Sequence, residues 1–515
     1  MQPLSVLLVL ATLSAGPLIE ADLVIRNAEI YDGSGGPPIA GDVAIHGDRI
    51  VAIGKFETVG TPREIDAAGL IVAPGFIDLH NHSDTPITQA QTRLNKNYIT
   101  QGCTTIVTGN CGGGQVDVGE YLKLIDEHSA GTNVIHLIPH GSVRRRVMQN
   151  EKRPAAPAEL EQMKELFERG MREGAWGMST GLIYVPSKYA DLGELVELAR
   201  VVGSHGGIYA SHMRNENTRL LEAIDEALTI GQQANLPVHI SHFKASGRAA
   251  WGLAADAVRK VQQARDAGQV VTCDQYPYIA SSTSLGAMVV PDEFRAQNKL
   301  VEALADPQQA SKLRGQIGRM IETRSGGASL FIASYRANRA WQGKDLATLA
   351  REQSQPVLEL VLEIQRNGGA SMVNFGMQEE EVRLIMQQSF VATASDGGAK
   401  IPDNTAPHPR NYGTFPRKIG HYAIDGKIIS LSQAIRSSTG LPADILGMKQ
   451  RGYLRMGSYA DVVVFDAETL RDTATFQKPH QYATGVRYLL INGQLVIDEG
   501  QVTGTLAGRA LRRPA

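Results

Sequence analysis

Short apolar runs alternate with amphipathic stretches from about residue 70 to residue 450. The amphipathic segments DLGELVELARVVGSHG and LLEAIDEALTIGQQAN repeat apolar residues at helical spacing, and NLP closes the second as a helix stop. Short apolar runs between such helices are typical of the strands of a parallel sheet. This alternation predicts a chain of repeated βα units.

Eight of the apolar runs are predicted as strands. They span residues 76–82, 104–112, 133–141, 176–184, 207–214, 237–244, 270–278 and 390–398. Eight βα units predict an α/β fold with a closed, TIM-like (β/α)8 barrel over residues 71–450.

The gap between the seventh and eighth predicted strands is too long for one loop. Residues 285–385 contain helical patterns of their own, including DLATLAREQSQPVLELVLEIQRNGG and QEEEVRLIMQQ. We therefore expect a helical insertion over the mouth of the barrel.

The two ends of the chain resemble each other. LVIRNAEIYDGSG (23–35) and YLLINGQLVIDEG (488–500) both alternate apolar residues around an Asn and finish at Asp before Gly, and ADVVVFDAETL (460–470) has a similar pattern. These segments predict one small β-sandwich domain, built from residues 22–70 and 451–515, into which the barrel is inserted.

The N-terminal segment is expected to be a signal peptide, residues 1–21. Residues 4–19 are apolar but too short to span a bilayer, and the small Ala21 marks a cleavage point. MQPLS lacks the usual positive charge, so an uncleaved or disordered leader is the alternative. Cleavage would place the protein outside the cytoplasm, either secreted or periplasmic. No other segment of the sequence reaches transmembrane length.

Composition excludes some partners. The 515 residues are 43% hydrophobic, enough for a large core, and 51 Lys+Arg against 53 Asp+Glu give a net charge of -2. This balance points neither to nucleic acid nor to an anionic membrane surface. The one basic cluster, Arg144 to Arg146, is expected to be a solvated surface face.

The three cysteines cannot form a disulfide framework, because their number is odd. Cys103 and Cys273 belong near the second and seventh strands, which are not neighbours, so a bridge between them is not expected either. At least one of the three cysteines, Cys103, Cys111 and Cys273, must therefore have a role other than a disulfide.

Residues that bind metals or transfer protons gather at the predicted strand ends. His80 and His82 are two apart on a strand, so both side chains point to one face and can hold one metal ion. In a βα barrel the carboxyl ends of the strands carry the chemistry. Five of the eight strands end in such residues: His80 with His82, Cys111, His212, His242 and Asp396. By contrast, His136, His140, Cys103 and Cys273 are interpreted as satisfied core residues.

Several motifs resemble one known family. GFIDLHNHSD, TGNCG, ASHMRNE, ISHFK, ASDGG and HPRNYGTFPR are similar to the N-acyl-D-amino-acid deacylase (D-aminoacylase) group of the amidohydrolase superfamily, over nearly the whole chain after the leader. The first motif is shared across the superfamily, whereas GNCG and HPRNYGTFPR are more specific to this group.

The resemblance implies a zinc centre. Many amidohydrolases bridge two metals with a carboxylated lysine on strand 4, but WGMSTGLIY has no lysine. In the family that the chain resembles, a cysteine on strand 2 has that role, which implies Cys111. A tightly held Zn²⁺ is then expected on Cys111, His212 and His242, with a second, weaker position shared by His80, His82 and Cys111. Thiolate and imidazole ligands suit zinc on general grounds too.

The residue types then suggest a hydrolytic mechanism. Zinc makes hydroxide available at neutral pH, and Asp396 can orient the water, take its proton and pass it to the leaving nitrogen. The alternative for Asp396 is a helix N-cap before Gly397.

The substrate that the resemblance implies, an N-acyl amino acid, carries a free α-carboxylate, which requires a cationic partner. Arg410 and Lys244 are the candidates, with Tyr184, Tyr276 and Ser282 as hydrogen-bond partners. Arg417 is left as a surface or structural residue. GNCGGG is not a phosphate loop, because no Gly-Lys-Ser/Thr follows.

The sequence therefore predicts a zinc hydrolase acting on a small molecule, an N-acyl-D-amino acid. The selectivity for D over L comes from the resemblance alone. One alternative is hydrolysis of a cyclic amide or dipeptide on the same fold, which the missing lysine disfavours. A second is a non-catalytic barrel that binds small molecules, which would have lost its ligand residues.

Overall fold

The computed structural model describes residues 18–295 and 297–514. Most of the expected leader, residues 1–17, lies outside the described residues. Leu18–Glu20 forms strand β1, which pairs in parallel with β5 (Glu57–Val59). No helix in the described part of the chain is long and apolar enough to cross a membrane.

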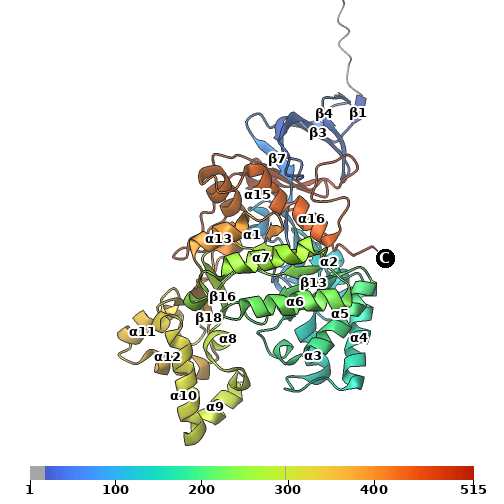
Figure 1. Ribbon diagram of the computed structural model, residues 1–515. Helices are drawn as coiled ribbons and strands as arrows, with labels where there is room; N and C mark the ends of the chain where they lie inside the picture. The colour runs from blue at the N-terminus through green and yellow to red at the C-terminus, as the bar shows by residue number, and fades with distance from the viewer. Residues whose placement is uncertain (1–17, 296, 515) are drawn as a thin grey trace, which may run out of the picture.

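Parallel strands form the barrel at the centre of the molecule (Figure 1). In chain order they are β8 (Phe76–Asp78), β9 (Cys103–Thr108), β10 (Asn133–His136) with β11 (Ile138–Pro139), β12 (Gly177–Gly181), β13 (Ile208–His212), β14 (Val238–Ile240), β15 (Val271–Gln275) and β19 (Val391–Thr393). A parallel bridge between Asn81 and Gly397 joins the last strand to the first, and the Asp396 N–H donates to the His80 carbonyl at 2.8 Å. Counting β10 and β11 as one interrupted strand, the described chain has the eight barrel strands expected.

Amphipathic helices surround these strands. They are α2 (Val118–His128), α3 (His140–Met148), α4 (Pro157–Arg172), α5 (Leu192–Ser204), α6 (Leu220–Ala234), α7 (Leu253–Asp266), α13 (Glu379–Met386), α15 (Leu431–Ser438) and α16 (Gly440–Leu446). Helix α6 shows why they form: Leu220, Ala223, Ile224 and Ala227 are buried at helical spacing, and Asn235 ends the helix in the left-handed conformation. Shorter helices, α1 (Lys96–Ile99), α14 (Arg410–Pro416) and the π-helix η8 (Arg417–Asp425), complete this layer.

Both chain ends contribute to a second sheet at one end of the molecule (Figure 1). Its members are β2 (Leu23–Ile30), β3 (Ile39–His46), β4 (Arg49–Gly54), β6 (Arg63–Asp66), β7 (Ile71–Pro74), β20 (Val462–Phe465), β21 (Val486–Ile491), β22 (Gln494–Asp498) and β23 (Gln501–Val502). The sequence predicted a sandwich, but the hydrogen bonds join these strands into one nine-stranded sheet, which forks at β2. Both faces of the sheet are packed in hydrophobic clusters, because successive side chains point to opposite faces: Ile25 belongs to one cluster and Val24 to the other.

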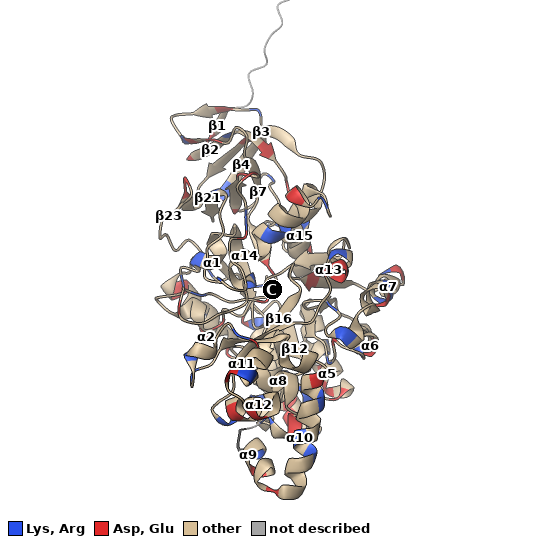
Figure 2. Cartoon of the chain, turned by 90° about the vertical axis from the view of Figure 1, so that its left-hand side faces the viewer, with Lys and Arg blue, Asp and Glu red and all other residues tan. Residues whose placement is uncertain are grey.

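The segment between β15 and β19 projects from the barrel at the opposite end from this sheet (Figures 1 and 2). It contains α8 (Leu285–Val289), α9 (Gln297–Ala305), α10 (Pro307–Glu322), α11 (Leu346–Glu352) and α12 (Val357–Arg366). It also contains an antiparallel sheet of β16 (Ala280–Ser284), β18 (Ser371–Phe375) and β17 (Leu330–Ser334). A separate hydrophobic core that includes Leu313, Trp341 and Leu360 holds this segment together.

Two features of the expected insertion need correction. It is not purely helical, because it contains β17 and β18, and β18 also pairs with β16, the polar run ASSTS that lies just before residue 285. The last expected helix, QEEEVRLIMQQ, is α13, which packs against α7 in the barrel layer instead of belonging to the insertion. The charges on the helices around the barrel and in the insertion are of both signs and interspersed (Figure 2), which agrees with the net charge of -2.

Candidate metal centre and active site

The predicted strand-end residues converge at one end of the barrel. Four of them, His82, Cys111, His212 and His242, line a cavity of about 670 Å³ together with Asp396, and His80 lies fully buried beneath it. They come from the ends of five different strands, so the parallel order of the barrel brings them together.

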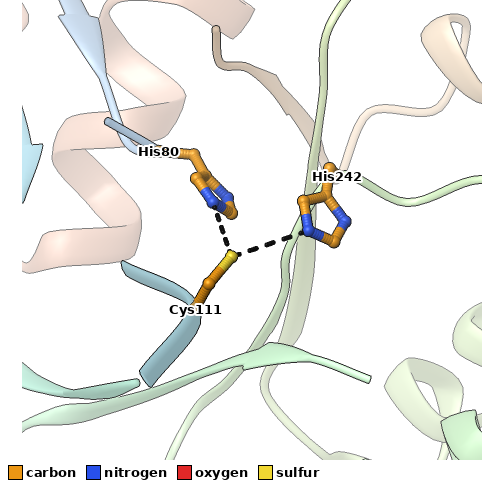
Figure 3. A group of neighbouring side chains, drawn as sticks. All are labelled: His80, Cys111 and His242. Carbon is orange, nitrogen blue, oxygen red and sulfur yellow. Dashed lines mark hydrogen bonds between the residues drawn. The ribbon is translucent and has the colours of Figure 1, made fainter. Parts of the chain in front are cut away.

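Cys111 lies among three of the histidines. Its Sγ is 3.2 Å from His80 Nε2, 3.4 Å from His212 Nδ1 and 3.8 Å from His242 Nε2. Figure 3 shows His80 and His242 pointing at the sulfur from two sides. Burial alone would raise the pKa of the Cys111 thiol, but the imidazoles of His80 and His212 outweigh burial and hold this pKa well below its ordinary value.

The loop that carries Cys111 depends on close backbone approach. Cys111 has φ 53°, in the left-handed region, within the short turn Asn110–Gly112. At the end of β12, a Cβ on Gly181 would lie 2.1 Å from the Cys111 carbonyl oxygen, so only glycine fits there. The fourth barrel strand, β12, therefore supports the cysteine loop, and its sequence GMSTG contains no lysine.

The donor atoms fit zinc. His212 Nδ1 and His242 Nε2 are 2.8 Å apart, and both face the Cys111 sulfur. One thiolate and two imidazole donors therefore converge on one point, where a single ion could bind. A second group of donors, His80, His82 and Asp396, has its ligand atoms within 4.8 Å of one another. Imidazole nitrogens and a thiolate that converge in this way are the donor set that zinc takes in proteins.

Two carboxylates that were not singled out from the sequence, the buried Asp274 and the slightly exposed Glu216, orient these histidines. Asp274 accepts the backbone N–H of His242 at 2.7 Å, and its Oδ2 lies 3.5 Å from His80 Nδ1. Glu216 Oε1 lies 2.8 Å from His242 Nδ1. Carboxylates that contact the second ring nitrogen of a ligand histidine fix its tautomer and raise its basicity.

These carboxylates are ionised despite their burial. Burial would raise the pKa of Glu216, but Lys244 and His242 lower it far below its ordinary value, and His80 and His239 do the same for Asp274. The sequence contains only weak signals for these two carboxylates. Asp274 lies inside an apolar run, and Glu216 follows His212 by four residues in a loop.

Asp396 contacts both sides of the cavity. Its Oδ1 lies 3.0 Å from His82 Nε2, and its Oδ2 forms an ion pair with Arg410 Nη1 at 2.8 Å. Burial would raise the pKa of Asp396, but the guanidinium of Arg410 and the imidazole of His80 hold it well below its ordinary value. No helix begins at Gly397 in the structure, so the N-cap alternative for Asp396 is excluded.

The predicted substrate-binding residues all line the same cavity. Arg410 lies over the Tyr276 ring at 4.7 Å, and the buried Tyr276 hydroxyl has no hydrogen-bond partner among the described residues. The Tyr184 hydroxyl lies 3.1 Å from Thr283 Oγ1, and Ser282 lies beside Thr283 on β16.

Lys244 is less free than the sequence suggested. Its ammonium donates to Glu216 Oε1 at 2.6 Å and to the His242 carbonyl at 3.0 Å. Its Nζ also lies 2.9 Å from His242 Nδ1, so Glu216 and His242 together engage all three N–H groups and Lys244 holds Glu216 against His242.

Arg417 and the residues interpreted as core residues have structural partners. Arg417 donates to the Pro277 carbonyl and pairs with Asp472. His136 contacts Thr108 and Gln115, His140 contacts Ser187 and Glu194, and the thiols of Cys103 and Cys273 are free and buried.

The expectation for the basic cluster is wrong for Arg144. This residue is fully buried and donates to Glu194 Oε2 at 2.6 Å, because the acidic partner lies fifty residues away in sequence but adjacent in the fold. Arg145 and Arg146 remain exposed.

Comparison with known proteins gives one consistent result. The Amidohydrolase family model (Amidohydro_3) matches residues 63–299 and 332–497. The chain is 34% identical to the D-aminoacylase and 33% identical to the N-acyl-D-glutamate deacylase of Alcaligenes xylosoxydans xylosoxydans; each alignment covers 96% of this chain, and 98% and 97% of those proteins.

A solved structure agrees with these relatives over the same length. The N-acyl-D-glutamate deacylase of Bordetella bronchiseptica, in complex with zinc and a phosphonate mimic of the tetrahedral intermediate, is 30% identical and superposes with a TM-score of 0.83. The superposition covers 96% of this chain and 100% of that one.

Proposed function

This chain belongs to the amidohydrolase family, and we propose that it is a zinc-dependent hydrolase that converts N-acyl-D-amino acids to a carboxylate and a free D-amino acid. The observation that carries the proposal is the convergence of the Cys111 thiolate, two imidazoles and the carboxylate of Asp396 on one cavity. Relatives of full length that are named for this reaction support it.

Cys111, His212 and His242 would hold the tight zinc, and His80, His82, Cys111 and Asp396 could share a second, weaker position. Zinc bound there would act as a Lewis acid and lower the pKa of a coordinated water from about 15.7 to about 7. Asp274 and Glu216 keep His80 and His242 in the orientation that presents their other ring nitrogen to the centre.

Asp396 acts as the proton carrier in the proposed reaction. Its carboxylate is ionised at neutral pH, so it can accept the proton of the attacking water and deliver it to the amide nitrogen as the C–N bond breaks. His82 and Arg410 contact one carboxylate oxygen each and fix the direction in which the group points.

Arg410 is the proposed partner of the substrate α-carboxylate. One of its terminal nitrogens pairs with Asp396, while the rest of the planar fork lies over Tyr276 at the cavity wall. The free Tyr276 hydroxyl can donate to the same carboxylate, and Lys244, Tyr184 and Ser282 lie on the remaining wall. Pairing with both Asp396 and the substrate would place the amide beside the proton carrier.

Hydrolysis of a cyclic amide is the second candidate. Dihydropyrimidinase from Brevibacillus agri shares the fold at 17% identity and a TM-score of 0.57, a similarity that supports the barrel alone. The absence of lysine from β12, whose sequence is GMSTG, remains the observation against it.

A hydrolysis panel tests the proposed function. Purified enzyme is incubated with N-acetyl-D- and N-acetyl-L-amino acids bearing acidic, aliphatic and aromatic side chains, alongside a hydantoin and a dihydropyrimidine. We expect turnover of D-configured linear amides. Turnover of the cyclic amides alone would assign the second candidate.

We also infer export from the cytoplasm, on the basis of the apolar leader and the small Ala21. N-terminal sequencing of the protein recovered from its native host tests this inference. A new terminus near residue 22 supports export, and an intact Met1 contradicts it.

A further inference from the structure

Arg145 lies on a wall shared by two cavities. It belongs to α3 and lines both the 670 Å³ cavity that contains Cys111 and a neighbouring cavity of about 950 Å³ between the barrel and the insertion. The other residues common to both cavities are Tyr184, Val185, Ser282 and Thr283. A group bound at Arg145 can therefore belong to a molecule whose amide lies at the metal centre.

Arg145 differs from the arginines on either side of it. Arg144 is buried against Glu194, and Arg146 forms an exposed pair with Asp117 at 2.7 Å. Among the described residues, Arg145 has no acidic partner.

The guanidinium of Arg145 is held by neutral acceptors. Nη2 donates to the Val185 carbonyl at 2.9 Å, and Nε donates to Asn150 Oδ1 at 3.4 Å. These contacts orient the fork, and Nη1 has no hydrogen-bond partner in the described part of the chain. The positive charge therefore remains uncompensated.

The inner cavity has no spare carboxylate to neutralise Arg145. Its acidic groups are already engaged: Glu216 with Lys244, Asp396 with Arg410, and Asp84 with the backbone N–H of Gly109. In the outer cavity Asp292 is paired with Lys188 and Arg295, and the exposed Glu293 lines the outer cavity only. An anion that bridges the two cavities would meet a free guanidinium at Arg145.

We propose that Arg145 determines specificity by binding a second carboxylate of the substrate, one additional to the α-carboxylate. This inference rests on the proposed function and narrows its substrate class to N-acyl-D-amino acids with two acidic groups. The second carboxylate can belong to the side chain, as in a D-glutamate derivative, or to the acyl group, as in a succinyl derivative. Both supply the planar anion that a guanidinium pairs with.

Two matched substrate pairs test the inference and separate the two sources. N-acetyl-D-glutamate is compared with N-acetyl-D-glutamine, and N-succinyl-D-leucine with its terminal amide, N-succinamoyl-D-leucine. Each pair differs by one charge at nearly constant shape. The enzymes are the parent, Arg145→Ala, Arg145→Lys and the control Arg146→Ala, which removes a neighbouring arginine that lines neither cavity.

We expect the parent to prefer the acidic member of at least one pair by about tenfold in kcat/KM, the scale of one charge-assisted hydrogen bond at an exposed site. Arg145→Ala should remove the preference while changing kcat/KM for the neutral members by less than about threefold. Arg145→Lys should retain part of it, Arg146→Ala should retain all of it, and added salt should weaken it because Arg145 is exposed.

Each contrary result has a distinct meaning. Equal rates within both pairs in the parent, or an equal loss for acidic and neutral members in Arg145→Ala, would overturn the inference and leave the proposed function intact. If none of the four compounds is hydrolysed by the parent, the proposed function fails and this inference fails with it.

Discussion

Asp396 and Arg410 form an ion pair with little solvent exposure, with 2.8 Å between Oδ2 and Nη1. From the sequence these residues are expected to have separate roles, proton transfer and carboxylate binding, but in the structure each holds the other in place. Arg410 keeps Asp396 ionised, and Arg410 Nε has no hydrogen-bond partner among the described residues, so part of the guanidinium is left for a second anion. A change at either residue should therefore disturb both roles, unless the substituted side chain keeps the geometry.

Asp396→Asn preserves the shape of the side chain and removes its capacity to accept a proton. We expect a folded protein that retains its tight zinc and loses about 10² to 10⁴ in kcat, the usual contribution of general acid–base catalysis. Zinc content and kcat are measured on the same preparation. An active Asn variant would assign proton transfer to another group. Loss of zinc would mean that the main role of Asp396 is to bind the metal.

Arg410→Ala should lower kcat/KM by a hundredfold or more, because a charge-assisted pair contributes roughly 1.5 to 3 kcal/mol per bond. Arg410→Lys should recover only part of the loss, since an ammonium does not reproduce the fork. Activity loss alone would also follow from the broken pair with Asp396, so the test uses a substrate whose α-carboxylate is a neutral amide. The parent should discriminate strongly against the amide and Arg410→Ala hardly at all; equal discrimination by both would transfer the role to Lys244.

Cys111→Ala should lose the tight zinc, because two imidazoles remain where three donors converged. Cys103→Ala is the matched control, since that thiol is free, buried and outside the cavity. Metal analysis after gel filtration compares the two variants. Full zinc content in Cys111→Ala, together with rapid alkylation of Cys111 in the parent, would contradict the assignment.

Lys418 is the basis of a prediction about stability. It is buried in η8, its ammonium has no hydrogen-bond partner among the described residues, and burial lowers its pKa from 10.5 to about 7. Between these two values the unfolded chain binds the proton and the folded chain does not, so Lys418 destabilises the fold by up to about 1.4 kcal/mol for each pH unit below 10.5, levelling off near pH 7.

Lys418→Met should therefore raise the melting temperature at pH 7, and the gain should shrink as the pH approaches 10. Lys449→Met, at an exposed position, should change the melting temperature little at either pH. Calorimetry at several pH values checks both variants. A gain that is independent of pH would mean that packing and not the buried amine is responsible.

The strand-end residues could be identified from the sequence because buried parallel strands appear as apolar runs, and polar residues at their ends stand out. Cys111, His212, His242 and Asp396 were found in this way, and the barrel order brings them to one cavity. Their roles as ligands and proton carrier remain proposals that the variants above test.

Other features depend on contacts that no local pattern records. Asp274 lies inside an apolar run, and only the fold shows that its carboxylate faces His80 and the backbone of His242. Arg144 was expected in solvent because Glu194, its partner, is distant in sequence. The strand β16 has Ser and Thr in place of apolar alternation, and its pairing with residues 371–375 defines it.

Zinc titration of the metal-depleted parent tests the central claim most directly, with release of D-leucine from N-acetyl-D-leucine as the measured quantity. We predict negligible turnover without metal, a rise in rate that follows the first equivalent of zinc per chain, and little release of L-leucine from the L-substrate. A full rate in protein that holds only a few per cent of an equivalent of metal, or a rate indifferent to added zinc, would contradict the account.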